Sequence, residues 1–198
     1  MPPDHYPWSK KYGFVQYLYG VTWQVGLGDL KQSGQKITPC LLFVNQNFGK
    51  AESTLLHYLD IFPESGIDEI QKYEAGEAAP EGFIKNARFH LSGEKFMIMD
   101  GPGEHHFNFD EAVSFIVSCR NQKETDYYRA VLSKGRAPES QACGWLRDKY
   151  GLSWQVVPEA VYDILSKTEG PKRDAVLRAI VQMKKIDIDK LEDASRSS

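Results

Sequence analysis

The chain has 198 residues, of which 41% are hydrophobic and 26% charged. These fractions are close to those of ordinary globular proteins, so they exclude a chain that is disordered throughout. The formal net charge of -3 provides no basic field for nucleic acid, and the length exceeds a prior of about 150 residues for one domain.

An internal repeat accounts for part of this excess length. Residues 13–25 (GFVQYLYGVTWQV) and 144–156 (GWLRDKYGLSWQV) are identical at six of thirteen positions. In each copy a β-type run meets a Tyr-Gly turn, and a second run with alternating character follows. The repeat therefore predicts two similar β-hairpins, the first of them within residues 1–27.

A glycine-rich stretch at residues 26–36 predicts a linker after the first hairpin. The next elements have the pattern of one β-α-β-β-β unit, since short apolar runs alternate with one helical period. We expect its strand, helix and three further strands at residues 37–44, 48–62, 67–73, 83–91 and 95–99.

The order then recurs in a shorter form. We expect a strand at residues 112–119, a helix at 122–134 and then the second hairpin. Four residues of this helix are expected to face inward: Tyr127, Tyr128, Val131 and Leu132. Two closing helices are expected at residues 158–166 and 171–188, with frayed residues at 194–198.

Cysteine usage and apolar run length restrict the cellular setting. Cys40, Cys119 and Cys143 have no paired spacing, so we expect buried thiols rather than disulfides or nucleophiles. The longest apolar runs are far shorter than the ~20 residues that span a bilayer. No secretory signal follows Lys10 and Lys11. We therefore expect a cytoplasmic protein with neither membrane nor nucleic acid as a partner.

Several motifs follow one another in a fixed order. They are ITP at 37–39, IFP at 61–63, HFNF at 106–109, CGWLRDKYGLSWQ at 143–155 and MKKID at 183–187. Together they resemble the PhnB-like branch of the vicinal-oxygen-chelate (glyoxalase/bleomycin-resistance/dioxygenase) superfamily. The resemblance extends over about residues 36–188, and the run at 143–155 is its most specific stretch.

The resemblance implies an α+β fold of paired β-α-β-β-β modules, whose curved mixed sheets enclose a pocket, with helices at the C-terminus. Residues 37–198 would form one complete domain. Residues 1–30 resemble an orphan hairpin that remains from a preceding homologous domain, joined by a linker at 31–36. The chain is thus similar to the C-terminal part of a tandem two-domain member. A homodimer is also implied.

In metal-using members of this superfamily, His, Glu or Gln ligands lie on the first and last strands of each module. The matching last-strand residue here is Gln155, and Asp100 is the one plausible acidic donor, while residues 37–44 offer no His, Asp or Glu. This set is incomplete, so we expect no catalytic metal. Gln155 could instead bond to neighbouring strands or contact a ligand.

Other catalytic motifs are absent from the sequence. It contains no GxSxG, GxxxxGK[ST] or GxGxxG pattern, so we assign no catalytic residue and discount the methyltransferase label that some family members carry. Aromatic and methionine side chains with one amide suit a small, partly apolar ligand. The candidate ligand-binding residues are Phe96, Met99, Phe109, Phe115, Trp145, Trp154 and Gln155.

Three functions therefore remain open. The first is metal-independent binding of a small molecule in a sheet-lined pocket. The second is a divalent-metal lyase, isomerase or dioxygenase with Asp100 and Gln155 as ligands. The third is a structural or interaction role, in which the apolar side of the hairpin at residues 1–27 seeks a partner.

Overall fold

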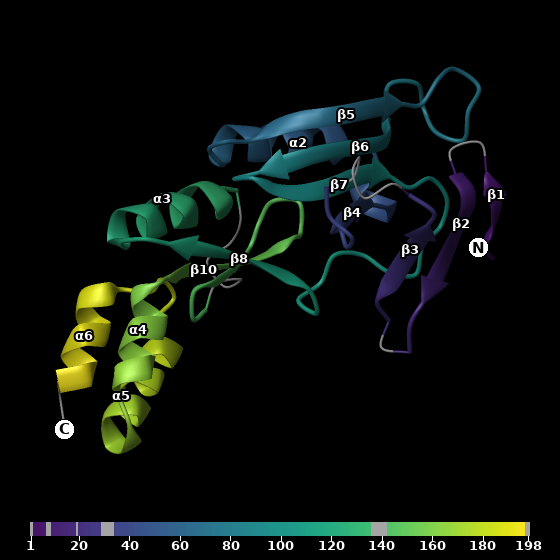
Figure 1. Ribbon diagram of the computed structural model, residues 1–198. Coiled ribbons are helices and arrows are strands. Elements are labelled where there is room, and N and C mark those ends of the chain that lie inside the picture. Colours follow the sequence, from purple (N-terminus) through teal and green to yellow (C-terminus); the bar gives the residue numbers. More distant parts are fainter. Residues whose placement is uncertain (1, 7–8, 19, 29–33, 136–141, 197–198) are drawn as a thin grey trace.

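Figure 1 shows the computed structural model, which describes residues 2–6, 9–18, 20–28, 34–135 and 142–196. The expected α+β class is confirmed, since mixed sheets alternate with helices. Part of the expected linker at residues 31–36 and most of the loop before the second hairpin lie outside the described residues.

The first module has the expected β-α-β-β-β order. Its four-stranded sheet has the strand order β4-β7-β6-β5, with β4 parallel to β7 and the other pairs antiparallel. The elements are β4 (Cys40–Phe43), α2 (Ala51–Ile61), β5 (Gly66–Lys72), β6 (Ile84–Leu91) and β7 (Glu94–Asp100).

Helix α2 begins later than its apolar period suggests. A short 3-10 turn, η1 (Asn45–Asn47), comes first, and Gly49 follows with a φ of +84°. A β-carbon at Gly49 would lie 2.6 Å from the ring of Phe83, so both the backbone angle and the space favour glycine there. The helix ends before Pro63, because Phe62 is already extended.

The second module has three strands in the order β8-β10-β9. Its elements are β8 (Ser114–Cys119), α3 (Gln122–Leu132), β9 (Trp145–Arg147) and β10 (Ser153–Pro158). The Asn121 side chain caps α3 by accepting from the Glu124 amide at 3.0 Å, while the Glu124 carboxylate accepts from the Arg120 amide. These two hydrogen bonds fix where α3 begins.

The inward face of α3 differs from the sequence expectation. Tyr127 is exposed, whereas Thr125, Arg129 and Leu132 are buried. Arg129 is tolerated there because its Nη1 donates to the Trp145 carbonyl at 2.9 Å. The expectation for Tyr127 was wrong because periodicity counts tyrosine as apolar, although its hydroxyl allows it to lie at the surface. Periodicity likewise counts arginine as exposed, although a hydrogen-bonded arginine such as Arg129 can be buried.

The N-terminal residues form a separate three-stranded sheet of β1 (Asp4–Tyr6), β2 (Ser9–Gln16) and β3 (Thr22–Gly26). Strands β2 and β3 are the two runs of the first hairpin, paired antiparallel. The Gln24 amide nitrogen lies 3.4 Å from Cys40 Sγ and 3.7 Å from Met99 Sδ. This sheet therefore contacts the β4–β7 side of the first module, at the end opposite the C-terminal helices (Figure 1).

Three C-terminal helices form their own small core. They are α4 (Ala160–Lys167), α5 (Gly170–Gln182) and α6 (Ile188–Arg196), so the single helix expected over residues 171–188 was wrong. The chain turns at Met183, and Ile186 and Leu191 then pack against Val161 and Val176. Residues 194–196 are helical rather than frayed. No helix in the described ranges is long and apolar enough to cross a membrane.

One aromatic core joins the two modules. Tyr58 of α2 and Phe62, which directly follows this helix, contact Trp154 of β10, with ring centres 5.3 and 5.5 Å apart. Phe96 of β7 meets Phe115 of β8 edge to face at 5.3 Å. Because α2 covers parts of both sheets, it fixes the modules relative to each other.

Candidate functional site

A buried carboxylate organises the junction of the modules. Asp148 Oδ1 accepts from the Tyr150 and Leu152 amides at 2.9 and 3.0 Å. Its Oδ2 accepts from Trp154 Nε1 at 3.0 Å and from the Tyr58 hydroxyl. Burial, followed by the charge of Asp148, raises the pKa of Tyr58 well above its usual value. Asp148 therefore holds the β9–β10 turn against α2, and it gives the run at 143–155 a structural role.

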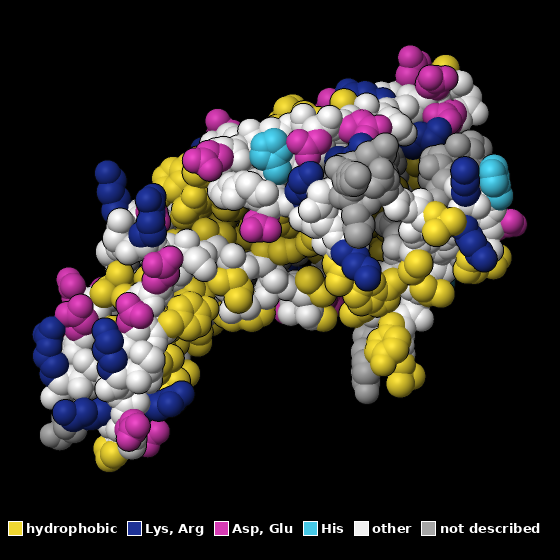
Figure 2. Space-filling model, viewed as in Figure 1, with side chains coloured by type: hydrophobic (Ala, Val, Ile, Leu, Met, Phe, Trp, Pro, Cys, Tyr) yellow, Lys and Arg dark blue, Asp and Glu magenta, His cyan; other side chains and the backbone are white. Residues whose placement is uncertain are grey.

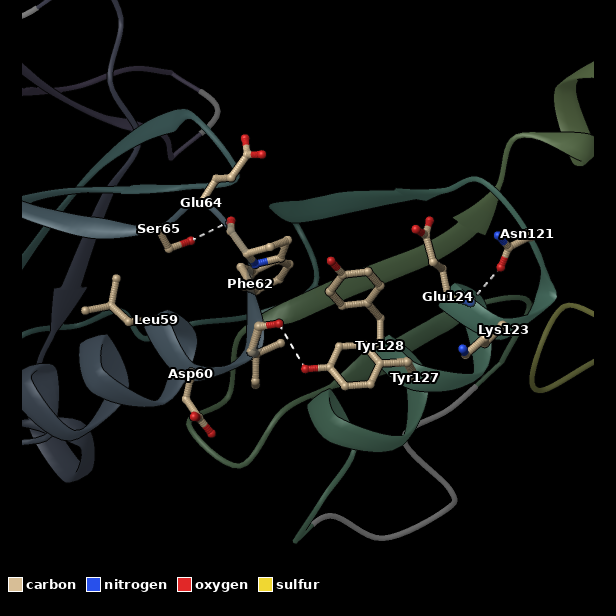
Figure 3. Close-up of a pocket in the computed structure, with 12 residues that line it drawn as sticks. Leu59, Asp60, Phe62, Glu64, Ser65, Asn121, Lys123, Glu124, Tyr127 and Tyr128 are labelled. Atoms are coloured by element: carbon tan, nitrogen blue, oxygen red, sulfur yellow. Dashed lines mark hydrogen bonds between the residues drawn. The ribbon is translucent and has the colours of Figure 1, made fainter.

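An open cleft lies beside this junction, between the end of α2 and the start of α3 (Figure 3). Its volume is about 830 Å³, which is within the range of small-molecule sites. The residues that line it are Leu59, Asp60, Ile61, Phe62, Pro63, Glu64, Ser65, Asn121, Lys123, Glu124, Tyr127 and Tyr128. None of them was among the candidate ligand-binding residues of the sequence.

Stacked aromatic rings form the apolar wall of the cleft. Phe62 stacks on Tyr128 with ring centres 5.3 Å apart and on Trp154 at 5.5 Å. The Tyr127 hydroxyl donates to the Ile61 carbonyl at 3.1 Å and so links α3 to α2 (Figure 3). Burial is the main cause that raises the pKa of Tyr128, so its hydroxyl stays protonated near neutral pH. The wall can accept a flat apolar group.

Charged residues at the cleft are mostly acidic. Asp60, Glu64 and Glu124 line it together with one ammonium group, that of Lys123. Glu124 is also paired with Arg120, and this contact and the Arg120 amide lower its pKa. The balance of charge favours a neutral or cationic ligand over an anionic one.

The candidate ligand-binding residues divide between separate places. Phe96, Phe115 and Trp154 form one aromatic chain, in which Phe115 and Trp154 have ring centres 5.5 Å apart. Trp154 does not line the cleft, but its ring stacks on Phe62, which does. Phe109 packs edge to face on Phe43 at 5.0 Å, in a different part of the core.

The remaining candidates lie on the sheet faces. Met99 lies beneath the Gln24 amide. Gln155 is paired in register with Trp145 on β9, and its amide donates to Ser114 Oγ on β8 at 2.8 Å. Gln155 therefore bonds to a neighbouring strand, which was one of the two roles considered for it.

The two metal candidates do not form a joint site. Asp100 is buried, and its carboxylate accepts from the amides of Gly49, Ala51 and Ile84 at 2.8, 3.3 and 3.1 Å. Gln155 belongs to the other sheet. The described residues contain no group of three or more His, Cys, Asp or Glu side chains placed to hold a metal ion. Asp100 acts instead as an anchor for the start of α2.

A thiol lies at the contact between the N-terminal sheet and the first module. Burial raises the pKa of Cys40 to about 11, against a smaller opposing effect of the Gln24 amide. Gln24 and Gln155 occupy equivalent positions in the two repeat copies, and each amide bonds to side chains from neighbouring strands. The repeat thus places the same residue in a similar setting twice.

These features define a domain of two β-α-β modules with a glyoxalase-like arrangement of sheets and helices. A family model described as 3-demethylubiquinone-9 3-methyltransferase matches residues 35–157, and the chain belongs to this PhnB-like family. The match ends one residue before the end of β10, so the N-terminal sheet and α4–α6 lie outside it.

Two solved structures illustrate the similarity. The PhnB protein of Bacillus cereus is 36% identical, with a TM-score of 0.55, and the match covers 63% of this chain and 99% of that one. A protein of Pseudomonas aeruginosa is 17% identical, with a TM-score of 0.51, over 63% of this chain and 98% of its own, and it shares the fold. No curated protein matches the chain.

Proposed function

We propose that this domain binds a small, partly apolar molecule in the cleft between α2 and α3 and needs no catalytic metal to do so. The observation that carries the proposal is the stack of Trp154, Phe62 and Tyr128, which ends in a cleft of about 830 Å³. The acidic balance of the lining favours a neutral or cationic aromatic compound. The proposed ligand site therefore lies between two helices, whereas the candidate residues of the sequence suggested a site on the sheet faces.

The name of the family describes a methyl transfer, but the proposal does not depend on that reaction. The sequence lacks the GxGxxG pattern of a glycine-rich nucleotide loop. The Asp100 carboxylate accepts from the Gly49 and Ala51 amides at the start of α2 and from the Ile84 amide of β6, and the Gln155 amide donates to Ser114. No reaction step is therefore assigned to either residue.

A thermal-shift screen with small neutral and cationic aromatic compounds tests the proposal. A ligand at about a hundred times its Kd should raise Tm by roughly 5–10 °C in a protein of this size. Tyr128→Ala should weaken binding about tenfold or more, since it removes one stacked ring. Tyr162→Ala, which changes an exposed tyrosine on α4, is the matched control and should leave binding unchanged.

Two results would contradict the proposal. The first is the absence of any saturable hit in the screen, and the second is a hit whose affinity is the same with Tyr128→Ala. Elemental analysis of gently purified protein tests the metal-free part separately. A stoichiometric divalent metal whose removal abolishes ligand binding would overturn that part and favour the metal-dependent alternative.

The outer face of the β2–β3 hairpin favours a second candidate role, which is self-association. Val15, Trp23 and Val25 share this face and are 50%, 45% and 59% exposed. Their counterparts in the second copy, Leu146, Trp154 and Val156, are 2%, 3% and 1% exposed because helices cover them. The same apolar pattern is thus covered in one copy and exposed in the other.

We propose that a second copy of the chain covers this face in a two-fold homodimer. A two-fold axis brings the same apolar face of the two chains together, so each residue of that face is buried in both copies. Figure 2 shows that hydrophobic side chains also gather at the projecting end of the hairpin, where Tyr17, Leu18 and Val21 are exposed. Apolar surface of this kind is typical of an interaction site.

Light scattering after gel filtration measures the mass. Trp23→Ser should shift the particle from two chains to one, whereas Val181→Ser, a change of an exposed apolar residue on α5, should leave the dimer intact. A wild-type mass of one chain would contradict the dimer.

We also propose that residues 1–30 derive from the last hairpin of a preceding homologous domain, which the repeat supports. We further propose that the protein is cytoplasmic, which its three free thiols support.

A further inference from the structure

A second cavity, of about 420 Å³, lies where the approach to α2 meets the turn between β9 and β10. It shares no lining residue with the cleft between α2 and α3. The residues that line it are Gln46, Asn47, Lys50, Asn108, Phe109, Gly135, Arg147, Lys149, Tyr150 and Gly151. Phe109 is the one candidate ligand-binding residue of the sequence that lines either of these two cavities.

The charge of this cavity is opposite to that of the cleft. Lys50, Arg147 and Lys149 line it, and the described lining contains no Asp or Glu. Lys50 Nζ donates to Asn47 Oδ1 at 3.2 Å, and Lys149 Nζ lies 5.0 Å from the centre of the Tyr150 ring. These contacts hold both ammonium groups without neutralising them. A cavity with this lining attracts anions.

Arg147 is the part of the lining whose hydrogen bonds are incomplete. Its Nη2 pairs with Glu111, whose side chain is largely exposed. Its Nε is buried and, within the described residues, is the buried side-chain nitrogen or oxygen that has no hydrogen-bond partner. Because buried donors are nearly always paired in native proteins, this one calls for an acceptor. A guanidinium group is suited to the oxygens of phosphates and carboxylates.

Neutral side chains fix one wall of the cavity. Asn47 is buried, and its Nδ2 donates to Asn108 Oδ1 at 3.1 Å and to the Tyr150 carbonyl at 3.0 Å. These bonds join the 3-10 turn before α2, the loop before β8 and the β9–β10 turn. The site is therefore built from both modules and is held in place before any ligand arrives.

We propose that this cavity binds the oxyanion group of a small molecule, through Arg147, Lys50 and Lys149. The Arg147 guanidinium group donates to one anion oxygen, and the two ammonium groups balance the remaining charge. The volume of about 420 Å³ leaves room for an organic group beside the oxyanion. The site is separate from the cleft of the proposed function, and the two proposals can fail independently.

An NMR titration reads the site directly, because a buried arginine Nε–H group gives its own resonance. The probes are inorganic phosphate and glycerol 3-phosphate, with glycerol as the uncharged control, at constant physiological ionic strength. We expect saturable shifts of the Arg147 Nε–H signal and of the Lys149 and Tyr150 amides with both anions. Glycerol should shift none of these signals. The amide signals of Tyr127 and Tyr128 in the cleft should not shift with any of the probes.

Variants separate a built site from general attraction to lysines. Arg147→Lys and Lys149→Gln should each weaken binding about tenfold, since a charge-assisted hydrogen bond or a nearby charge is lost. Lys85→Gln is the matched control, because Lys85 also lies over a tyrosine ring, that of Tyr73, but outside the cavity. It should leave the affinity unchanged. If Arg147→Lys fails to fold, Lys149→Gln alone carries the comparison.

The two anions distinguish the sources of the oxyanion. Tighter binding of glycerol 3-phosphate supports a phosphorylated small molecule, and equal binding supports the inorganic ion at the same oxyanion site. Shifts that do not saturate and are spread over surface lysines would indicate an adventitious ion only. That result, or an unmoved Arg147 Nε–H signal, would overturn the proposal.

Discussion

The carboxylate of Asp148 accepts hydrogen bonds from four donors, which belong to the β9–β10 turn, to Trp154 and to Tyr58 of α2. Such a buried carboxylate stabilises the fold only while all of its hydrogen-bond donors are present. Sequence patterns did not single out Asp148, because an acidic residue beside Lys149 in a turn is usually exposed. The structure shows why the run at 143–155 has this composition.

We predict that Asp148→Asn lowers the free energy of unfolding by about 3 kcal/mol, since the neutral amide cannot accept all four bonds. Tyr58→Phe should cost about 1 kcal/mol through the loss of one hydrogen bond. Urea unfolding measures both. Asp126→Asn removes a carboxylate from the exposed pair with Lys185 and should change stability by less than about 0.5 kcal/mol. An equal loss for Asp126→Asn and Asp148→Asn would contradict this account.

The thiols give a second prediction at the residue scale. Burial raises the pKa of both Cys40 and Cys119 from 9.0 to about 11. At pH 8 the thiolate fraction falls about a hundredfold, so iodoacetamide should alkylate both far more slowly than in the unfolded chain. Mass spectrometry of the modified peptides measures the rates. Alkylation of folded Cys119 as fast as in urea would contradict the burial described here.

The raised pKa values of these two thiols also make the free energy of unfolding depend on pH. Because the folded pKa values are raised, these thiols contribute their full stability below pH 9 and lose it as pH rises from 9 to about 11. Each shift of about two units corresponds to roughly 2–3 kcal/mol at most. Urea midpoints at pH 8 and pH 10.5 should therefore fall with pH, and the fall should be smaller with Cys119→Ser.

At the scale of elements, the N-terminal hairpin covers one edge of the first module. Gln24 of this hairpin contacts Cys40 on β4 and Met99 on β7. This contact places the hairpin over the thiol of Cys40 and accounts for its burial. A hairpin that detached freely would leave Cys40 open to water.

Removal of residues 1–27 should therefore lower the pKa of Cys40 toward its usual value and speed its alkylation at least tenfold at pH 8. Cys119 lies in the second module, so its unchanged rate provides an internal control. Circular dichroism should show that the rest of the fold persists. Equal Cys40 rates in the two proteins would mean that the hairpin does not cover the thiol in solution.

Local pattern predicted most elements but not all of their limits. The apolar period of α2 and the alternation in β6 and β7 are strong local signals, and the repeat revealed the hairpin of β2 and β3. The break between α5 and α6 was missed because Met183 and Ile186 continue a helical pattern, although the chain turns there so that Ile186 packs near Val176. Tertiary packing overrides the period at that point.

On the scale of the whole molecule, the cleft could not be predicted from local pattern. Phe62 and Tyr128 are far apart in the sequence, and both are ordinary core residues by type. Their stacking depends on how α2 and α3 approach each other across the module junction. Composition identified aromatic residues suited to a ligand, but most of them, such as Phe96 and Phe115, pack against one another instead.

The position of the ligand is the central claim, and an amide NMR titration with the tightest compound from the thermal-shift screen tests it most directly. We predict saturable shifts confined to residues 59–65 and 121–128, together with the Trp154 indole, which stacks behind Phe62. Shifts centred on Gln24, Met99 and Gln155 would place the ligand on the sheet faces and contradict the account.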